Sequence, residues 1–231
     1  MRRPASPLRH PLLRLAALLA LFAALAGDGD WWRRDWWAGA LRTAIDRLNP
    51  APPVADLAAP DCLRALAASG AGWSRLADFA TAEGCRVDAA VRVTGLAGAA
   101  LSAPVVAACP LALALQRHAE TVLQPAAREL LGSPVARIDH LGSFACRRVR
   151  GRPNGPLSQH AFARALDVAG YVTEDGRAVT LAADWTDSTA PPGRFLRRVA
   201  ARRGPFGTVI TPDDDRLHRD HIHFGLRGPI W

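Results

Sequence analysis

The chain has 231 residues, a formal net charge of +8 and a hydrophobic content of 49%. That hydrophobic fraction excludes a disordered chain, and about 170 residues remain after an N-terminal segment is set aside, enough for one domain with its own core. Arginine dominates the basic residues. There is no basic helix with interleaved aromatic residues and no zinc-finger spacing, so we expect no nucleic-acid partner. Anionic polymers of the cell envelope or lipid head groups are the expected partners of this charge.

The first 27 residues predict export. They begin with several arginines, continue with an apolar run at residues 15–26, and end with an Ala-x-Ala cleavage pattern before Gly27. The apolar run is shorter than the ~20 residues that span a bilayer. Tryptophans follow at residues 31–37, as in an interfacial aromatic belt, so an uncleaved membrane anchor is the alternative. Both alternatives predict a periplasmic protein, either soluble or anchored to the inner membrane.

Residues 28–59 are predicted to form a Trp-rich juxtamembrane segment that leads into a linker. A short helix is expected at residues 38–49, and the prolines at residues 50–53 stiffen the chain after it. The folded domain is expected to cover residues 60–231.

The first half of this domain is predicted to contain two helices with a strand between them. Asp61 is the expected N-cap of the first helix. Apolar and polar residues alternate at residues 85–93, which predicts a strand. An apolar stripe at residues 109–131 predicts the longest helix, kinked or split at Pro125 and ended by Gly132.

The second half is predicted to consist mainly of strands, at residues 135–143, 165–172, 179–181, 208–210 and 222–226. A hairpin turn is expected at residues 174–177 and a basic helix at residues 193–203. Helices that precede a small, mostly antiparallel sheet predict an α+β fold with the helices packed on the sheet.

Cysteine usage also favours export. The chain has four cysteines, Cys62, Cys85, Cys109 and Cys146, and no two of them form a Cys-x-x-Cys pair, which argues against a redox motif or a structural zinc knuckle. Four cysteines allow three disulfide connectivities. We favour Cys62–Cys85, which closes a loop of about 24 residues, together with Cys109–Cys146, which would steady the neighbouring Arg147.

Histidines gather near the C-terminal end of the chain. His218, His221 and His223 fall within six positions, although the whole chain has only 7 histidines. Side chains alternate along a strand, so His221 and His223 are expected to face one centre. Upstream, His160 and Asp167 are separated by roughly 10 Å if both lie on one helix, which is too far for two ligands that each approach one ion to ~2 Å. We therefore expect the chain to bend, with His160 on a turn and Asp167 on a strand.

Together the two clusters form the pattern Ser-x-His-x6-Asp followed by His-x-His. This pattern resembles the zinc peptidase superfamily of D-Ala-D-Ala carboxypeptidases, murein endopeptidases and Hedgehog signalling domains. The closer resemblance is to the bacterial extensin-like C-terminal domain family, over about residues 60–231. It is carried by the paired cysteines and by residues 142–147, 158–161, 166–168, 175–177, 185, 206–209 and 218–223.

The resemblance implies one Zn²⁺ ion per chain, bound by His160, Asp167 and His223, with water in the fourth position. It also implies an exported metallopeptidase that cleaves peptide bonds in peptidoglycan stem peptides, of the endopeptidase or carboxypeptidase type. The alternative is a non-catalytic zinc-containing module that binds the cell wall, because Hedgehog domains show that this fold does not guarantee hydrolysis.

Carboxypeptidase-type members place a glutamate three residues before the last ligand, and here that position holds Asp220. Endopeptidase-type members place a histidine at the first position of His-x-His, which is His221. Strand alternation puts Asp220 on the opposite face, so His221 is the expected base or transition-state stabiliser, with His218 as a further catalytic histidine. Arg147 is expected to pair with a substrate carboxylate, and Ser158 to orient the site loop or donate a hydrogen bond to the substrate.

Overall fold

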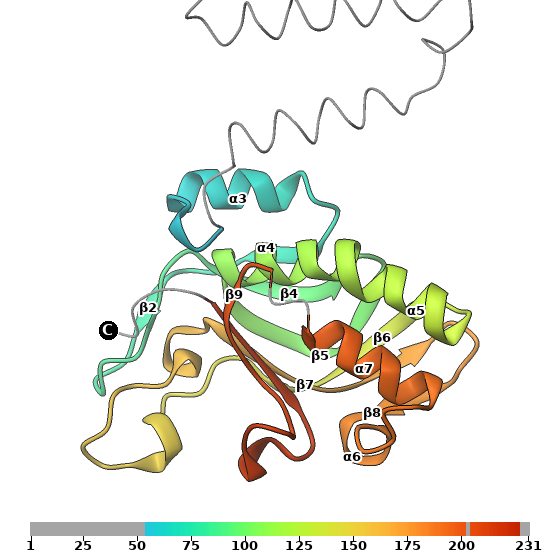
Figure 1. Ribbon diagram of the computed structural model, residues 1–231. Helices are drawn as coiled ribbons and strands as arrows, with labels where there is room; N and C mark the ends of the chain where they lie inside the picture. Colours follow the sequence, from blue (N-terminus) through green and yellow to red (C-terminus); the bar gives the residue numbers. More distant parts are fainter. Residues whose placement is uncertain (1–53, 202–203, 227–231) are drawn as a thin grey trace, which may run out of the picture. The chain divides into compact units, whose positions relative to one another are not determined.

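The computed structural model describes residues 54–201 and 204–226 (Figure 1). Its centre is a sheet with the strand order β1-β4-β5-β6-β7-β10-β9, and β8 pairs in addition with β7. Strands β5 and β6 run parallel, whereas the other paired strands of the sheet run antiparallel. Strands β2 and β3 form a separate ribbon. The strands are β1 (Gly72–Arg75), β2 (Phe79–Ala80), β3 (Arg86–Val87), β4 (Ala90–Leu96), β5 (Ala99–Ala108), β6 (Val135–Gly142), β7 (Ala165–Thr173), β8 (Ala178–Thr180), β9 (Phe206–Ile210) and β10 (Ile222–Leu226).

Helices α4, α5 and α7 cover one side of this sheet. Figure 1 shows α4, α5 and α7 lying along the sheet, with α3 stacked over α4. They are α3 (Ala59–Ala67), α4 (Cys109–His118), α5 (Gln124–Leu131), the single turn α6 (Leu181–Asp184) and α7 (Pro191–Ala201). The predicted α+β class is therefore confirmed. Helix α3 begins at Ala59, so Asp61 lies in its first turn. The prediction that Asp61 is the N-cap is therefore wrong.

The predicted helix at residues 109–131 is divided where the sequence contains a proline. Helix α4 ends at His118, a π-helical turn follows at Ala119–Leu123, and Pro125 lies at the start of α5. A proline lacks the N–H that a continuous helix needs, and its ring collides with the carbonyl four residues earlier. The wider π turn accommodates the ring, which is one of the recognised causes of a helix irregularity. Gly132 ends α5 with φ +77°, as predicted.

Strand alternation sorts β7 and β10 into a core face and an open face. On the core face, Leu166, Val168 and Phe224 line a small cavity together with His118 of α4. Side chains that alternate with period 2 must then place Asp167 and His223 on the face away from the helices. The open face of these two central strands is therefore where chemistry can take place.

Two further predictions about the N-terminal half are wrong. The predicted strand at residues 85–93 is broken, because Ala89 adopts φ +49° between β3 and β4. The favoured disulfides Cys62–Cys85 and Cys109–Cys146 are also wrong, since the structure contains Cys62–Cys109 and Cys85–Cys146.

The physical reason for the second error is tertiary packing. The favoured pairing minimised the loop that each disulfide closes, whereas the fold brings together cysteines that are distant in sequence. Stacking of α3 on α4 sets the Cα atoms of Cys62 and Cys109 6.1 Å apart. The loop after β6 returns to the start of β3, which leaves the Cα atoms of Cys85 and Cys146 5.6 Å apart. Two disulfides in the folded domain favour an oxidising compartment.

Several predicted segments lie outside the described residues. These are the signal peptide or anchor at residues 1–27, the helix at 38–49, most of the juxtamembrane segment at 28–59 with its linker, and the end of the basic helix at 202–203. Within the ranges that the structure describes, no helix has the length and apolar character needed to cross a bilayer.

Candidate metal centre

The two central strands supply two of the predicted metal ligands. Asp167 lies on β7 and His223 lies on β10, and the antiparallel register pairs these two residues directly across the strands. His160 comes from a short 3-10 helix, Gln159–Phe162, that precedes β7. Ala163 then takes the left-handed conformation, φ +47°, and turns the chain into the strand. The predicted bend between His160 and Asp167 is confirmed.

The three side chains converge on one point. The His160 Nε2 atom lies 3.2 Å from His223 Nδ1 and 3.2 Å from Asp167 Oδ2, and His223 Nδ1 lies 2.9 Å from Asp167 Oδ1. The side chains of all three residues are buried. Donor atoms that surround a tetrahedral zinc ion at about 2 Å lie about 3.3 Å from one another. The group can therefore hold a metal ion of this size.

Hydrogen bonds behind the imidazoles determine which nitrogens face the centre as acceptors. The outer nitrogen of His160, Nδ1, lies 2.6 Å from the carbonyl oxygen of Ser143. A carbonyl can only accept, so Nδ1 carries the proton and Nε2 presents a lone pair. The outer nitrogen of His223, Nε2, lies 3.0 Å from Oε1 of Gln159. With neutral imidazoles, three acceptor atoms thus meet without a proton between them, which is an arrangement that favours a cation.

Asp167 remains ionised despite its burial. Burial is the largest influence on its carboxyl group and would raise its pKa, but hydrogen bonds and positive charge from His160 and His223, which these imidazoles supply when they carry a proton towards Asp167, outweigh it and hold the pKa well below the usual range. The carboxylate is the form that binds a metal.

One cleft contains the whole predicted site. It has a volume of about 440 Å³ and every candidate residue lines it. The lining residues are Arg147, Val149, Arg150, Ser158, Gln159, His160, Asp167, Thr208, Ile210, Asp215, Leu217, His218, His221 and His223. Gln159, Arg150 and Asp215 were not predicted from the sequence as site residues, because nothing in their spacing distinguishes them from surface polar residues.

His221 and His218 border the metal group from the loop before β10. The Nε2 atom of His221 lies 3.8 Å from Asp167 Oδ2, and its Nδ1 atom lies 2.9 Å from Asp220 Oδ1. This hydrogen bond lowers the pKa of Asp220, so its carboxylate accepts the Nδ1–H of His221. The ring of His218 lies 4.8 Å from that of His221, and burial, followed by the charges of His221 and His223, lowers the pKa of His218.

Ser158 and Arg147 lie on the loop at residues 143–158. The Oγ atom of Ser158 accepts the backbone N–H of His160 at 3.3 Å and so caps the short helix that carries the ligand. Arg147 is exposed, and its carbonyl accepts the N–H of Ser158 at 2.9 Å. Arg150 reaches Asp215 at 2.7 Å and ties this loop to the segment that carries His218.

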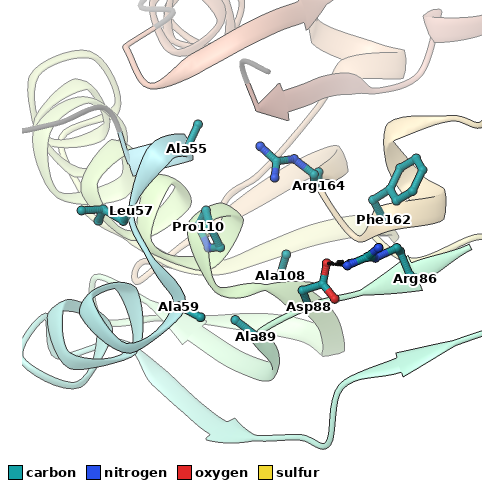
Figure 2. Close-up of a pocket in the computed structure, with 10 residues that line it drawn as sticks. All are labelled: Ala55, Leu57, Ala59, Arg86, Asp88, Ala89, Ala108, Pro110, Phe162 and Arg164. Carbon is teal, nitrogen blue, oxygen red and sulfur yellow. Dashed lines mark hydrogen bonds and ion pairs between the residues drawn. The ribbon is translucent and has the colours of Figure 1, made fainter. Parts of the chain in front are cut away.

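A second cavity, of about 370 Å³, lies where the start of the described chain meets β3 and the turn before β7. Figure 2 shows the guanidinium of Arg164 reaching into this cavity, between Ala55 and Phe162. Burial lowers the pKa of Arg164, an effect that Asp56 partly opposes. Arg86 pairs with Asp88 at 2.8 Å, so its charge is already balanced.

Comparison with known proteins defines the family of this chain. Neither the curated proteins nor the solved structures include a match. The family model described as Extensin-like protein C-terminus matches residues 60–230, a range that includes every residue of the metal group and cleft. The chain therefore belongs to the extensin-like protein C-terminus family.

Proposed function

We propose that this protein is an exported zinc metallopeptidase that hydrolyses peptide bonds in peptidoglycan stem peptides. The observation that carries the proposal is the convergence of three acceptor atoms, from His160, Asp167 and His223, in a cleft that two further histidines border. Two nitrogen ligands and one oxygen ligand leave a fourth position for water, which is typical of catalytic zinc sites and unlike the closed sites that serve structure.

These three residues would hold Zn²⁺. When bound, zinc supplies a Lewis acid that lowers the pKa of water to about 7 and polarises a carbonyl group. The affinity of the ligands for the metal is supported by their outer hydrogen bonds, to Ser143 and Gln159, which leave the inner nitrogens of His160 and His223 free of protons.

His221 is the proposed general base. Asp220 accepts its Nδ1–H at 2.9 Å, so Nε2 keeps its lone pair on the side of the metal group. This nitrogen can take the proton of the attacking water and then deliver it to the departing amine. Asp220 does not line the cleft, so its carboxylate serves to orient His221 and does not replace the glutamate of carboxypeptidase-type relatives. His218, with its lowered pKa, would be a second neutral imidazole beside the reacting centre.

Arg147 and Ser158 are the proposed substrate-binding residues. The exposed guanidinium of Arg147 lines the cleft and can form two parallel hydrogen bonds to a stem-peptide carboxylate. The hydroxyl of Ser158 accepts the N–H of His160 through its oxygen, and its hydrogen remains available to a substrate carbonyl. We propose that this activity takes place in the periplasm, with residues 1–27 serving as a signal peptide or an inner-membrane anchor; the two disulfides and the N-terminal sequence support this location.

Digestion of purified sacculi tests the proposal. Wild-type protein should release muropeptides that mass spectrometry identifies by the bond cleaved, and it should contain about one zinc ion per chain. The His221→Ala variant should keep its zinc but lose cleavage, whereas His160→Ala should lose both. A wild-type protein that is folded, contains no metal and binds none would overturn the proposal.

The second candidate function is a zinc-containing module that binds the cell wall without hydrolysing it. It is favoured by the absence of a glutamate among the residues that line the described cleft. The same experiment distinguishes the two functions, because a module would sediment with sacculi and release no muropeptides.

A further inference from the structure

We infer that Gln159 is a positioning residue that fixes the protonation and direction of the His223 imidazole, and that Gly225 keeps open the space that Gln159 requires. The inference rests on the metal centre of the proposed function. It adds two residues to that centre that would not bind the metal ion themselves.

The orientation of the Gln159 amide follows from its two partners. The Nε2 atom of Gln159 donates to the carbonyl oxygen of Leu226 at 2.8 Å. Because that carbonyl can only accept, the amide nitrogen must face Leu226 and the amide oxygen must face the other way. The oxygen lies 3.0 Å from Nε2 of His223. It can only accept, so His223 carries its proton on Nε2 and presents a lone pair on Nδ1.

That lone pair is directed at the metal group. His223 Nδ1 lies 2.9 Å from Asp167 Oδ1 and 3.2 Å from His160 Nε2. The other neutral tautomer would place a proton on Nδ1 and prevent it from binding a metal. Without an acceptor at Gln159, nothing in the described surroundings of Nε2 would favour the metal-binding tautomer or hold the plane of the ring.

Gly225 provides the space for this contact. A Cβ atom at position 225 would lie 1.9 Å from Oε1 and 2.8 Å from Cδ of Gln159, and 3.0 Å from Nε2 of His223. The amide of Gln159 thus lies directly over the glycine. Gly225 does not have a positive φ, so backbone conformation does not explain a glycine here. Space for the Gln159 amide does.

Metal affinity is the readout, because loss of an outer hydrogen-bond partner typically weakens metal binding 10- to 100-fold. Zinc-free full-length protein would be titrated with Zn²⁺ against a competing chromophoric chelator. We expect Gln159→Ala to bind zinc roughly 10- to 100-fold more weakly than wild type. Gln159→Glu should bind at least as tightly as wild type, since a carboxyl group at this position keeps an acceptor for His223 whether or not it is ionised.

A matched control separates positioning from general stability. Gln124 is also buried, and its amide also bonds to backbone groups, at Ala97 and Val135. It lies on α5, on the helix side of the sheet and away from the cleft. Gln124→Ala should lower the melting temperature and leave zinc affinity unchanged, whereas Gln159→Ala should lower zinc affinity by more than its melting temperature explains.

Gly225→Ala provides an independent test where it folds. It should weaken zinc binding as Gln159→Ala does. The double variant should bind zinc no more weakly than either single variant, because both changes remove the same contact between Gln159 and His223. Wild-type zinc affinity in Gln159→Ala, or an affinity for Gln159→Glu as low as that of Gln159→Ala, would overturn this inference but leave the proposed metal centre standing. A wild-type protein that binds no zinc would overturn the proposed metal centre and the inference with it.

Discussion

His118 is a buried histidine that the proposed chemistry does not use. It lies on α4 with its ring 5.3 Å from those of Phe206 and Phe224, and neither of its ring nitrogens has a hydrogen-bond partner in the described structure. Burial lowers its pKa from 6.5 to about 4. Between these two pH values the unfolded chain binds a proton that the folded protein does not. The stability that neutral His118 contributes is therefore complete above pH 6.5 and is lost as the pH falls towards 4.

We predict that this histidine makes the domain sensitive to mild acid. The free energy of unfolding should fall by about 2 to 3 kcal/mol between pH 7 and pH 4.5 through His118 alone. Urea unfolding of wild type and of His118→Leu at both pH values would measure this, with the metal content of the two proteins matched. The variant should lose less stability than wild type, and an equal loss in the two proteins would contradict the assignment to His118.

Arg147 allows a prediction about substrate binding. Arg147→Ala should lower kcat/KM on stem peptides by about 10- to 100-fold, the usual effect of losing a hydrogen bond to a charged group, while leaving zinc affinity unchanged. Arg148→Ala is the matched control, because Arg148 is also exposed but does not line the cleft. Steady-state kinetics on purified muropeptides would compare them. A similar loss in both variants would indicate a general effect of charge on the loop.

The residues of the metal group and the histidines beside it could be predicted from the sequence because their chemistry shows in residue type and spacing. Histidine and aspartate in His-x6-Asp and His-x-His are uncommon patterns, and strand alternation was enough to orient His223. Gln159 could not be predicted in this way. Its function depends on the close approach of Gly225 on another strand, and a glutamine beside a histidine is unremarkable in a sequence read by itself.

At the scale of elements, the two disulfides hold different parts of the molecule. Cys62–Cys109 joins α3 to α4, whereas Cys85–Cys146 joins the start of β3 to the loop that carries Arg147 and Ser158. The sequence separations are 47 and 61 residues. By the chain-entropy model, each disulfide stabilises the fold by about 4 kcal/mol.

We predict that removing each disulfide separates stability from activity. Replacing Cys62 and Cys109 by serine should lower the melting temperature with little effect on kcat/KM at a temperature where the protein is folded. Replacing Cys85 and Cys146 should lower both, since the substrate-binding loop loses its attachment. Calorimetry and muropeptide kinetics on the two double variants test this. Equal activity in both would show that the loop is held by its other contacts, such as Arg150 with Asp215.

Elements with a strong local sequence pattern were predicted, whereas strands with a weak local pattern were not. Pro125 divides the long helix and Gly132 ends it through their own backbone properties, which do not depend on what the helix packs against. Strand β5 was not predicted, because it is rich in alanine and contains Pro104, both unfavourable in strands. The structure tolerates Pro104 because it has no partner in the ladder with β4 or in the ladder with β6.

At the scale of the whole molecule, the proposed metal would connect three separate segments, the turn at His160 and the strands β7 and β10. A ligand that binds only the folded state stabilises it by about 4 kcal/mol when its free concentration is 1,000 times its Kd. For a domain of this size, chelation of zinc should therefore lower the melting temperature by roughly 10 °C. His160→Ala should melt at the same temperature with and without chelator. A wild-type melting temperature that stays unchanged after confirmed metal removal would contradict this prediction.

The alternation along β10 has a consequence for how this protein can change. Ile222 and Phe224 belong to the hydrophobic core, whereas His223 lines the cleft and Gly225 faces Gln159, which also lines the cleft. Alternate residues of this short strand thus serve two different purposes, packing of the core and formation of the site. A single residue inserted or deleted just before this strand would exchange the two sets, moving His223 into the apolar interior and Phe224 into the cleft. Substitutions can modify the core or the site separately, but a one-residue shift in the register of β10 disrupts the core packing and the site together.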